Sequence, residues 1–152
     1  AGAPAAGDVL EVGAYCGYSA LRLARALPGV RVSTLEVDPV HVVVARNVVA
    51  FAGLAGAVDV WTGHSRDLIP RLPRRGRARP RGFLFAAVFM DQRGARYHED
   101  LELLESRGLL LPGAAVIADN SLKPGAPLLL WGAASGAGQE LLVVRAAEFA
   151  MP

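Results

Sequence analysis

The chain has 152 residues, of which 53% are hydrophobic and 20% charged, so it can bury the core of one domain and is not a disordered segment. No apolar run approaches the roughly 18 residues of a transmembrane helix, and the first residues lack the basic and apolar regions of a signal peptide. The single cysteine, Cys16, excludes an intramolecular disulfide. We therefore expect a cytoplasmic protein, although an upstream targeting segment could be missing from this sequence.

The formal net charge of +2 depends on a basic cluster of six arginines between residues 71 and 81, without which the chain would be net acidic. Prolines and glycines interrupt this arginine-rich loop, and no aromatic residue lies in it to stack on bases. This pattern favours a solvated loop and gives no reason to expect nucleic-acid binding. The alternative is a binding patch for an acidic partner.

Strands and helices alternate along the whole chain. The first unit is a buried strand at 8–12, a glycine turn and a helix at 18–27. The later elements follow the same alternation, with strands expected at 31–36, 58–61, 83–90, 114–118 and 140–145, helices at 39–52, 65–72, 97–107 and 127–134, and a turn at Pro112-Gly113. This βαβ succession predicts one α/β domain with a doubly wound, mostly parallel sheet over residues 1–152.

The first unit is the stretch around which the rest of the chain is expected to be organised. Gly13 and Gly17 lie between its strand and its helix, which places backbone N–H groups at the carboxyl end of the sheet. In open α/β sheets, nucleotide-like ligands bind at that edge.

Polar residues recur where the predicted strands end. Because the carboxyl ends of parallel strands meet at one edge of a sheet, these residues are expected to share a cleft. They are Glu11, Gly13, Glu36, Ser65, Asp91, Asp119 and Asn120.

Glu36 ends the second predicted strand, nineteen residues after Gly17. A carboxylate in that place can accept both hydroxyl groups of a ribose, as in proteins that bind NAD or S-adenosylmethionine. The glycine spacing separates the two ligands, since Gly13-Ala-Tyr-Cys-Gly17 lacks the third glycine of the dinucleotide motif. The sequence therefore favours S-adenosylmethionine over NAD.

Asp91, Asp119 and Asn120 form a set of oxygen donors. Two carboxylates and an amide suit a hard cation, and Mg²⁺ fits best. The competing interpretation makes the two aspartates ordinary caps of the elements that follow them. No histidine of the chain has metal-ligand spacing, and Cys16 has no identifiable base.

With these residues considered together, the sequence resembles the catechol O-methyltransferase family of class I S-adenosylmethionine-dependent methyltransferases. The resemblance covers roughly Val9 to Pro127 and is strongest in three blocks. These are Leu10-Glu-Val-Gly-Ala-Tyr-Cys-Gly-Tyr-Ser19, Phe89-Met-Asp91 with Arg96-Tyr97, and Ala118-Asp-Asn120 with Pro124-Gly-Ala-Pro127.

The resemblance implies a single Rossmann-like methyltransferase domain that transfers a methyl group from S-adenosylmethionine to a hydroxyl of a catechol, with Mg²⁺. It implies metal ligands at Asp91, Asp119 and Asn120, and it makes Asp91 and Asn120 expected catalytic residues as well. The resemblance implies cofactor contacts at Glu11, Gly13, Tyr15, Ser19, Glu36 and Ser65. We add Gly17, for close approach, and Asp91 to the expected cofactor-binding residues.

The sequence departs from the family in three ways. The family's lysine base lies three residues after the metal aspartate, where this chain has Gly94, and Lys123 is the only lysine that could replace it. The family's late glutamate has no secure counterpart, although Glu148 is close in register. The N-terminal helices and the last antiparallel strand also lack counterparts, so we expect a chain truncated at both ends.

Two functions remain open at this point: an O-methyltransferase, or a catalytically impaired domain that binds S-adenosylmethionine or a protein partner. If the site is otherwise assembled, Gly94→Lys is expected to raise the rate, because a general base contributes about 10²–10⁴-fold.

Overall fold

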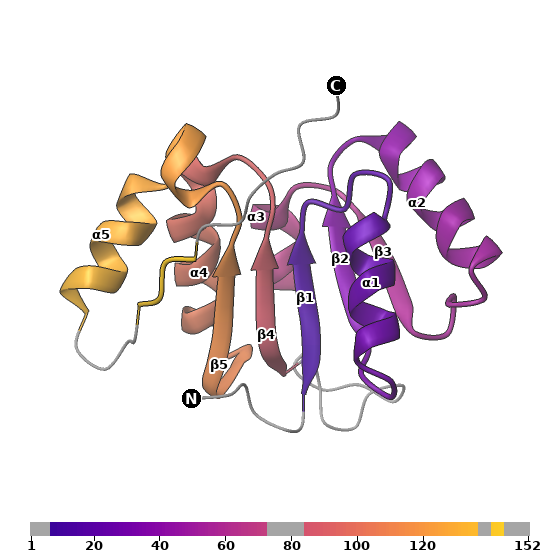
Figure 1. Cartoon of the computed structure of the whole chain (residues 1–152), viewed down its shortest axis with the longest axis horizontal. Helices are drawn as coiled ribbons and strands as arrows, with labels where there is room; N and C mark the ends of the chain where they lie inside the picture. Colours follow the sequence, from indigo (N-terminus) through magenta and orange to yellow (C-terminus); the bar gives the residue numbers. More distant parts are fainter. Residues whose placement is uncertain (1–6, 73–83, 137–140, 145–152) are drawn as a thin grey trace.

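The computed structural model describes residues 7–72, 84–136 and 141–144, and these form a parallel sheet with helices on both faces (Figure 1). The strands are β1 (Asp8–Val12), β2 (Val32–Glu36), β3 (Val58–Thr62), β4 (Phe85–Met90) and β5 (Leu110–Ala118). The helices are α1 (Tyr18–Ala26), α2 (Pro39–Phe51), α3 (Ser65–Leu68), α4 (Tyr97–Ser106) and α5 (Pro127–Ser135). Short helical turns η1 (Ile69–Arg71), η2 (Gly94–Arg96) and η3 (Ser121–Gly125) lie between them. The predicted α/β class and parallel sheet are confirmed.

The strand order is β3-β2-β1-β4-β5, and every neighbouring pair is parallel. The chain moves outward from β1 to β3 and then returns to the other side of β1 with β4. The loops after β1 and β4 therefore diverge to opposite faces of the sheet. Such a switch point is where ligands bind in folds of this kind.

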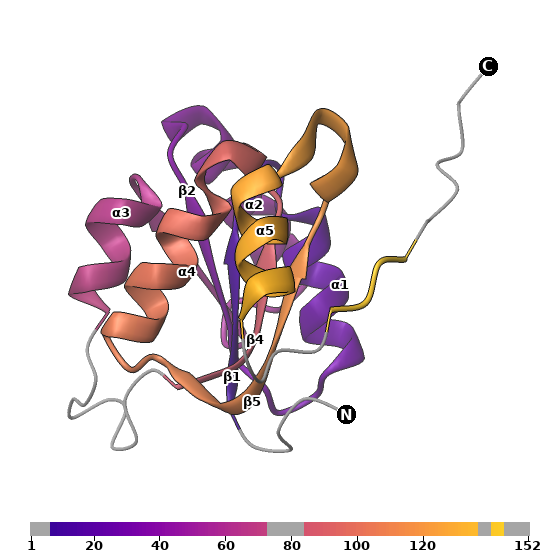
Figure 2. The ribbon, with the colours of Figure 1, turned by 90° about the vertical axis from the view of Figure 1, so that its left-hand side faces the viewer.

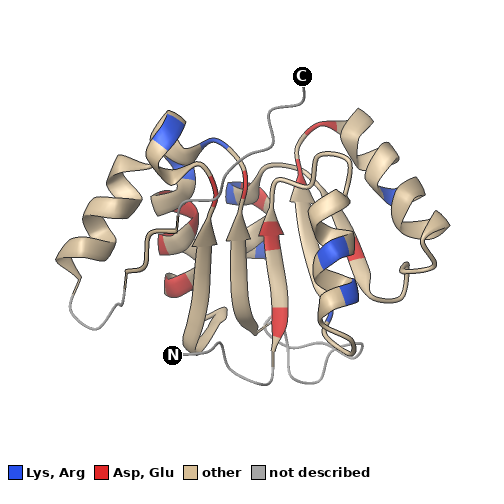
Figure 3. Cartoon of the chain, in the orientation of Figure 1, with Lys and Arg blue, Asp and Glu red and all other residues tan. Residues whose placement is uncertain are grey.

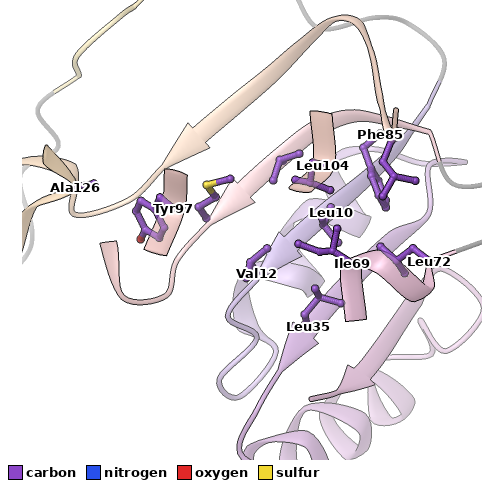
Figure 4. Close-up of a cluster of buried hydrophobic side chains, with 12 residues drawn as sticks. Leu10, Val12, Leu35, Ile69, Leu72, Phe85, Tyr97, Leu104 and Ala126 are labelled. Atoms are coloured by element: carbon purple, nitrogen blue, oxygen red, sulfur yellow. The ribbon is translucent and has the colours of Figure 1, made fainter. Parts of the chain in front are cut away.

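Two apolar cores lie on the two faces of the sheet. Helices α1 and α2 cover one face, and α3 and α4 cover the other (Figure 2). The smaller core packs α1 and α2 residues such as Ala20 and Val49 against Val9 and Val32. The larger core extends from Leu10 and Phe85 to Leu104 and Ala126 (Figure 4). Both cores lie below the carboxyl edge of the sheet and hold that edge in place.

Helix α2 begins where its sequence predicts. The side chain of Asp38 accepts a hydrogen bond from the Val40 N–H at 2.8 Å, and Pro39 occupies the first helical position. Glu36, at the end of β2, is thus followed at once by a well-anchored helix.

Two predicted elements differ in the structure. Pro112-Gly113 is not a separate turn but a bulge inside β5, where the six residues from Leu110 to Ala115 lie opposite only three on β4, Phe85 to Ala87. Gly113 accommodates the bulge with a φ of 77°. The strand predicted at 140–145 is wrong for residues 141–144, which are in neither a strand nor a helix.

The arginine-rich loop lies almost wholly outside the described residues, as does Glu148. Among the helices that the structure does describe, none has the length and apolar character needed to cross a lipid bilayer.

Candidate functional site

The residues singled out at the strand ends lie at one edge of the sheet. Acidic positions cluster at the upper, carboxyl ends of the strands in Figure 3. Glu11 lies within β1 and Glu36 is the last residue of β2. Ser65 begins α3, Asp91 follows β4, and Asp119-Asn120 follow β5. The structure thus places these residues at the carboxyl ends of the strands, along one edge of the sheet, and the shared cleft stays a prediction.

The Glu36 carboxylate anchors the glycine turn. Its Oε2 accepts a hydrogen bond from the Tyr15 N–H at 2.8 Å, and its Oε1 accepts one from the Asp38 N–H at 2.9 Å. Tyr15 adopts a left-handed φ of 47°, and its side chain is 65% exposed. His41 packs edge-on against the Tyr15 ring and brings Nδ1 to 3.9 Å from Glu36 Oε1. Each carboxylate oxygen keeps acceptor capacity for a further donor.

The two glycines of the turn serve packing within the protein. A β-carbon on Gly13 would lie 2.3 Å from the carbonyl oxygen of Asp91, so the loops after β1 and β4 meet at the switch point. A β-carbon on Gly17 would lie 3.2 Å from Ala45, so Gly17 lets α1 approach α2. Both residues have positive φ values, 102° and 83°. The close approach expected at Gly17 is thus an approach by a helix of the chain itself.

Glu11 is fully buried beneath this turn. The Thr34 hydroxyl donates a short hydrogen bond to Glu11 Oε2, while no hydrogen bond of ordinary geometry within the described residues reaches Oε1. Burial raises the pKa of Glu11 from 4.5 to about 7; the neighbouring Ser19 and Thr34 hydroxyls lower it, and the charges of Asp91 and Glu36 raise it. A buried carboxylate with an unsatisfied oxygen is well suited to receive a cationic donor.

We expect Glu11 to make folding stability depend on pH. The folded chain holds the Glu11 proton up to about pH 7, whereas the unfolded chain releases it near pH 4.5. Stability therefore falls as the pH rises through this interval, by about 3 kcal/mol for the full shift. Urea unfolding of the chain and of Glu11→Gln at pH 4.5 and 7.5 measures the difference, with the exposed Glu105→Gln as control. Parallel pH dependences for the chain and Glu11→Gln would contradict the expectation.

Asp91 and Asp119 form an acidic pair after the adjacent strands β4 and β5. Burial, and then the charge of Asp119, raise the pKa of the Asp91 carboxyl above its ordinary value. The Asp119 side chain accepts the Asn120 N–H at 2.6 Å, and Asn120 has a left-handed φ of 52°. In the described part of the chain no three His, Cys, Asp or Glu side chains are grouped for a metal, so a metal held by this acidic pair would need a ligand of another kind, such as the amide of Asn120.

Helix α4 brings two buried polar residues to the edge, of which the sequence analysis named Tyr97 only as part of a matching block and missed Asp100. Tyr97 and Asp100 are fully buried on α4. The Gln92 amide donates a short hydrogen bond to Asp100, and the Ser65 hydroxyl is a second hydrogen-bonding partner of this carboxylate. Burial raises the pKa of Asp100, and the hydrogen bonds with Ser65 and Gln92 lower it in part. Burial, with the charges of Asp91 and Asp119, raises the pKa of Tyr97 to about 12. The spacing of Tyr97, Asp100 and Leu104 along one helical face was the available signal.

The catalytic role predicted for Lys123 stays a prediction. Lys123 lies on η3 and is exposed, and within the described residues no ion pair ties it to the acidic pair. Gly94 begins η2, where a β-carbon would lie 2.5 Å from the carbonyl oxygen of Gly125 and 3.3 Å from the β-carbon of Ala126. The backbone of the η3 turn thus fills the space that a side chain at position 94 would need.

This packing argues against the gain in rate expected for Gly94→Lys. Any side chain at this position has to displace η3, and overpacking of this kind costs about 1–3 kcal/mol. We expect both Gly94→Ala and Gly94→Lys to lower the free energy of unfolding. We also expect that Gly94→Lys does not increase the rate of methyl transfer. Thermal unfolding compares Gly94→Ala with Gly56→Ala, whose β-carbon meets no atom within 4 Å. Equal stabilities of these two alanine variants would contradict the expectation.

Comparison with known proteins identifies a family. The family model described as O-methyltransferase matches residues 3–128. The chain is 44% identical over 120 residues to catechol O-methyltransferase of Bos taurus, a match that covers 78% of this chain and 43% of that protein. It is 45% identical over 124 residues to transmembrane O-methyltransferase of Homo sapiens, covering 80% and 41% respectively.

Solved structures agree with the sequence matches. An O-methyltransferase from Bacillus cereus in complex with SAH superimposes with a TM-score of 0.67 at 31% identity, covering 78% of this chain and 51% of that one. The chain thus spans about half the length of several curated relatives that it matches.

Proposed function

The chain belongs to the O-methyltransferase family, and from this premise we propose that it transfers a methyl group from S-adenosylmethionine to one hydroxyl of a catechol, assisted by Mg²⁺. Relatives named as catechol O-methyltransferases support the substrate class, and the Bacillus cereus protein in complex with SAH supports the cofactor. The observation that carries the proposal is the meeting of the glycine turn and the acidic pair, where Gly13 abuts the Asp91 carbonyl. We further propose one domain and a cytoplasmic location.

The cofactor fits the residues around the glycine turn. S-adenosylmethionine carries a ribose, a positively charged ammonium group and a methyl group on a sulfonium. In this proposal Glu36 accepts the ribose hydroxyls, because it is fixed by two backbone N–H groups and keeps acceptor capacity. Glu11, with its unsatisfied Oε1, faces the positive end, and Tyr15, Ser19 and Ser65 line the remaining surface.

The donor set at β4 and β5 fits Mg²⁺. Burial, and then the charge of Asp119, raise the pKa of Asp91, and a divalent cation would favour the charged form of both carboxylates. Asn120 would add a neutral oxygen, as a hard cation prefers. When bound there, Mg²⁺ would lower the pKa of a catechol hydroxyl and fix its orientation.

The chain's own contribution to the reaction is positioning and charge. The methyl group leaves sulfur as the carbon–oxygen bond forms, so the two reacting groups have to lie in line. The Glu36-anchored turn sets the place of the donor, and the loop of Asp91 sets the place of the acceptor oxygen. The contact between Gly13 and Asp91 fixes one loop against the other.

A second candidate function follows from Gly94. Without a lysine base at this position, the catechol proton has to pass to solvent, and a slow rate or binding without transfer would result. The impaired binding domain therefore remains the alternative proposal.

Methyl transfer from labelled S-adenosylmethionine to a simple catechol tests the two candidates. We expect label in the methylated catechol with Mg²⁺ and at least about a tenfold lower rate in excess chelator. Cofactor binding without any transfer would instead favour the binding domain. Equal rates of methyl transfer with Mg²⁺ and in excess chelator would show that the reaction does not depend on the metal.

A further inference from the structure

The buried hydroxyl of Tyr97 lies between the two loops that carry the acidic pair. Tyr97 begins α4 and is fully buried. Its Oη lies 3.0 Å from the carbonyl oxygen of Gln92 and 3.1 Å from that of Asp119. Figure 4 shows the ring near the arrowheads of β4 and β5, on the side of Ala126.

One of the two carbonyl groups belongs to a proposed metal ligand, and the other belongs to the neighbour of one. Gln92 directly follows Asp91, and Asp119 is itself a ligand in the proposal and precedes Asn120. The Asp119 N–H also donates to the Met90 carbonyl at 2.9 Å. The loops after β4 and β5 are therefore joined twice, once by the sheet and once by the phenol.

The hydroxyl of Tyr97 constrains a part of the two loops that the hydrogen bonds of the sheet do not reach. The sheet hydrogen bonds end at Met90, and farther along the two segments meet again where Gly94 packs against Gly125. A phenol has one proton, which it shares between two carbonyl oxygens, so the hydroxyl sets the distance between the two loops. The aromatic ring is held by the larger core, which makes the position of the hydroxyl rigid.

We propose that Tyr97 is a positioning residue for the metal-binding edge. Its hydroxyl holds the backbones of Gln92 and Asp119, and through Gln92 the adjacent Asp91, at the spacing that a bound divalent cation requires. This inference rests on the proposed metal site and adds a residue that does not touch the ion. Residues that orient metal ligands typically change metal affinity by about 10–100-fold.

The variant Tyr97→Phe removes the hydroxyl and keeps the ring that fills the core. Binding of Mn²⁺, as a paramagnetic substitute for Mg²⁺, is measured by electron paramagnetic resonance with S-adenosylmethionine present. We expect Mn²⁺ to bind about tenfold or more weakly to Tyr97→Phe, with S-adenosylmethionine affinity in the absence of metal unchanged within about twofold. In the transfer assay, we expect a higher Mg²⁺ requirement and a rate that largely recovers at saturating Mg²⁺.

Tyr18→Phe is the matched control, because Tyr18 is 65% exposed on α1 and should leave Mn²⁺ affinity unchanged. Equal Mn²⁺ affinity of Tyr97→Phe and the unaltered chain would overturn the inference while leaving the proposed function intact. Failure of the unaltered chain to bind Mn²⁺ would overturn the metal site itself and this inference with it. A weaker Mn²⁺ affinity matched by an equal loss of metal-free cofactor affinity would show general damage and would also overturn it.

Discussion

Replacement of Glu36 by glutamine is expected to weaken the binding of S-adenosylmethionine by about 100-fold or more, because a buried charged partner of a polar ligand is removed. The carboxylate has two tasks. It accepts the Tyr15 and Asp38 N–H groups, and it offers its remaining acceptor capacity to the ribose. A glutamine has a single oxygen, so its NH₂ group would face one of the two backbone donors. Isothermal titration calorimetry measures the loss directly.

The control for this variant is Glu105→Gln, an exposed side chain in the last turn of α4 far along the chain from the glycine turn. It makes the same chemical change and should bind S-adenosylmethionine as the unaltered chain does. Circular dichroism shows whether Glu36→Gln folds. If the folded variant binds S-adenosylmethionine as tightly as the unaltered chain, Glu36 does not contribute to the cofactor site.

Replacement of Asp119 by asparagine is expected to lower the Mg²⁺-dependent transfer rate by about 100-fold or more, since an ion that stabilises developing charge by several kcal/mol would lose a charged ligand. The change preserves the size of the side chain and an oxygen that can accept the Asn120 N–H. It also removes the like charge that raises the pKa of Asp91. We therefore expect the fold and the metal-free affinity for S-adenosylmethionine to be preserved.

Asp67→Asn provides the comparison, because Asp67 is an exposed acid on α3, with a side chain 55% exposed. Titration of the rate with Mg²⁺ separates an effect on ion binding from an effect on the chemical step. A rate for Asp119→Asn equal to that of Asp67→Asn would show that Asp119 is not a metal ligand.

The elements that carry the site follow from local patterns in the sequence. The apolar run of β1 and the Asp38-Pro39 helix start each specify an element through their nearest neighbours. The register of β5 depends on its distant partner β4, and the bulge at Pro112-Gly113 is visible only when the two strands are paired. The residues 141–144 have the apolar pattern of a strand but pair with no neighbour in the described structure, and periodicity cannot supply a partner.

The positions of the candidate site residues were predictable because parallel strands end at one edge. Glu36, Asp91 and Asp119 needed only a correct strand assignment. The environments of those residues depend on packing between segments far apart in the sequence. The meeting of Gly13 with Asp91 and of Gly94 with Gly125 is set by backbone approach, which no residue pattern encodes. The buried Asp100 was missed because an acid on a helix is ordinarily exposed.

Calorimetric titration of the chain with S-adenosylmethionine, with NAD as the comparison, tests the central claim most directly. The glycine turn, Glu36 and the buried carboxylate of Glu11 predict saturable binding of S-adenosylmethionine and much weaker binding of NAD. Tighter binding of NAD, or no binding of S-adenosylmethionine by the folded chain, would contradict the account.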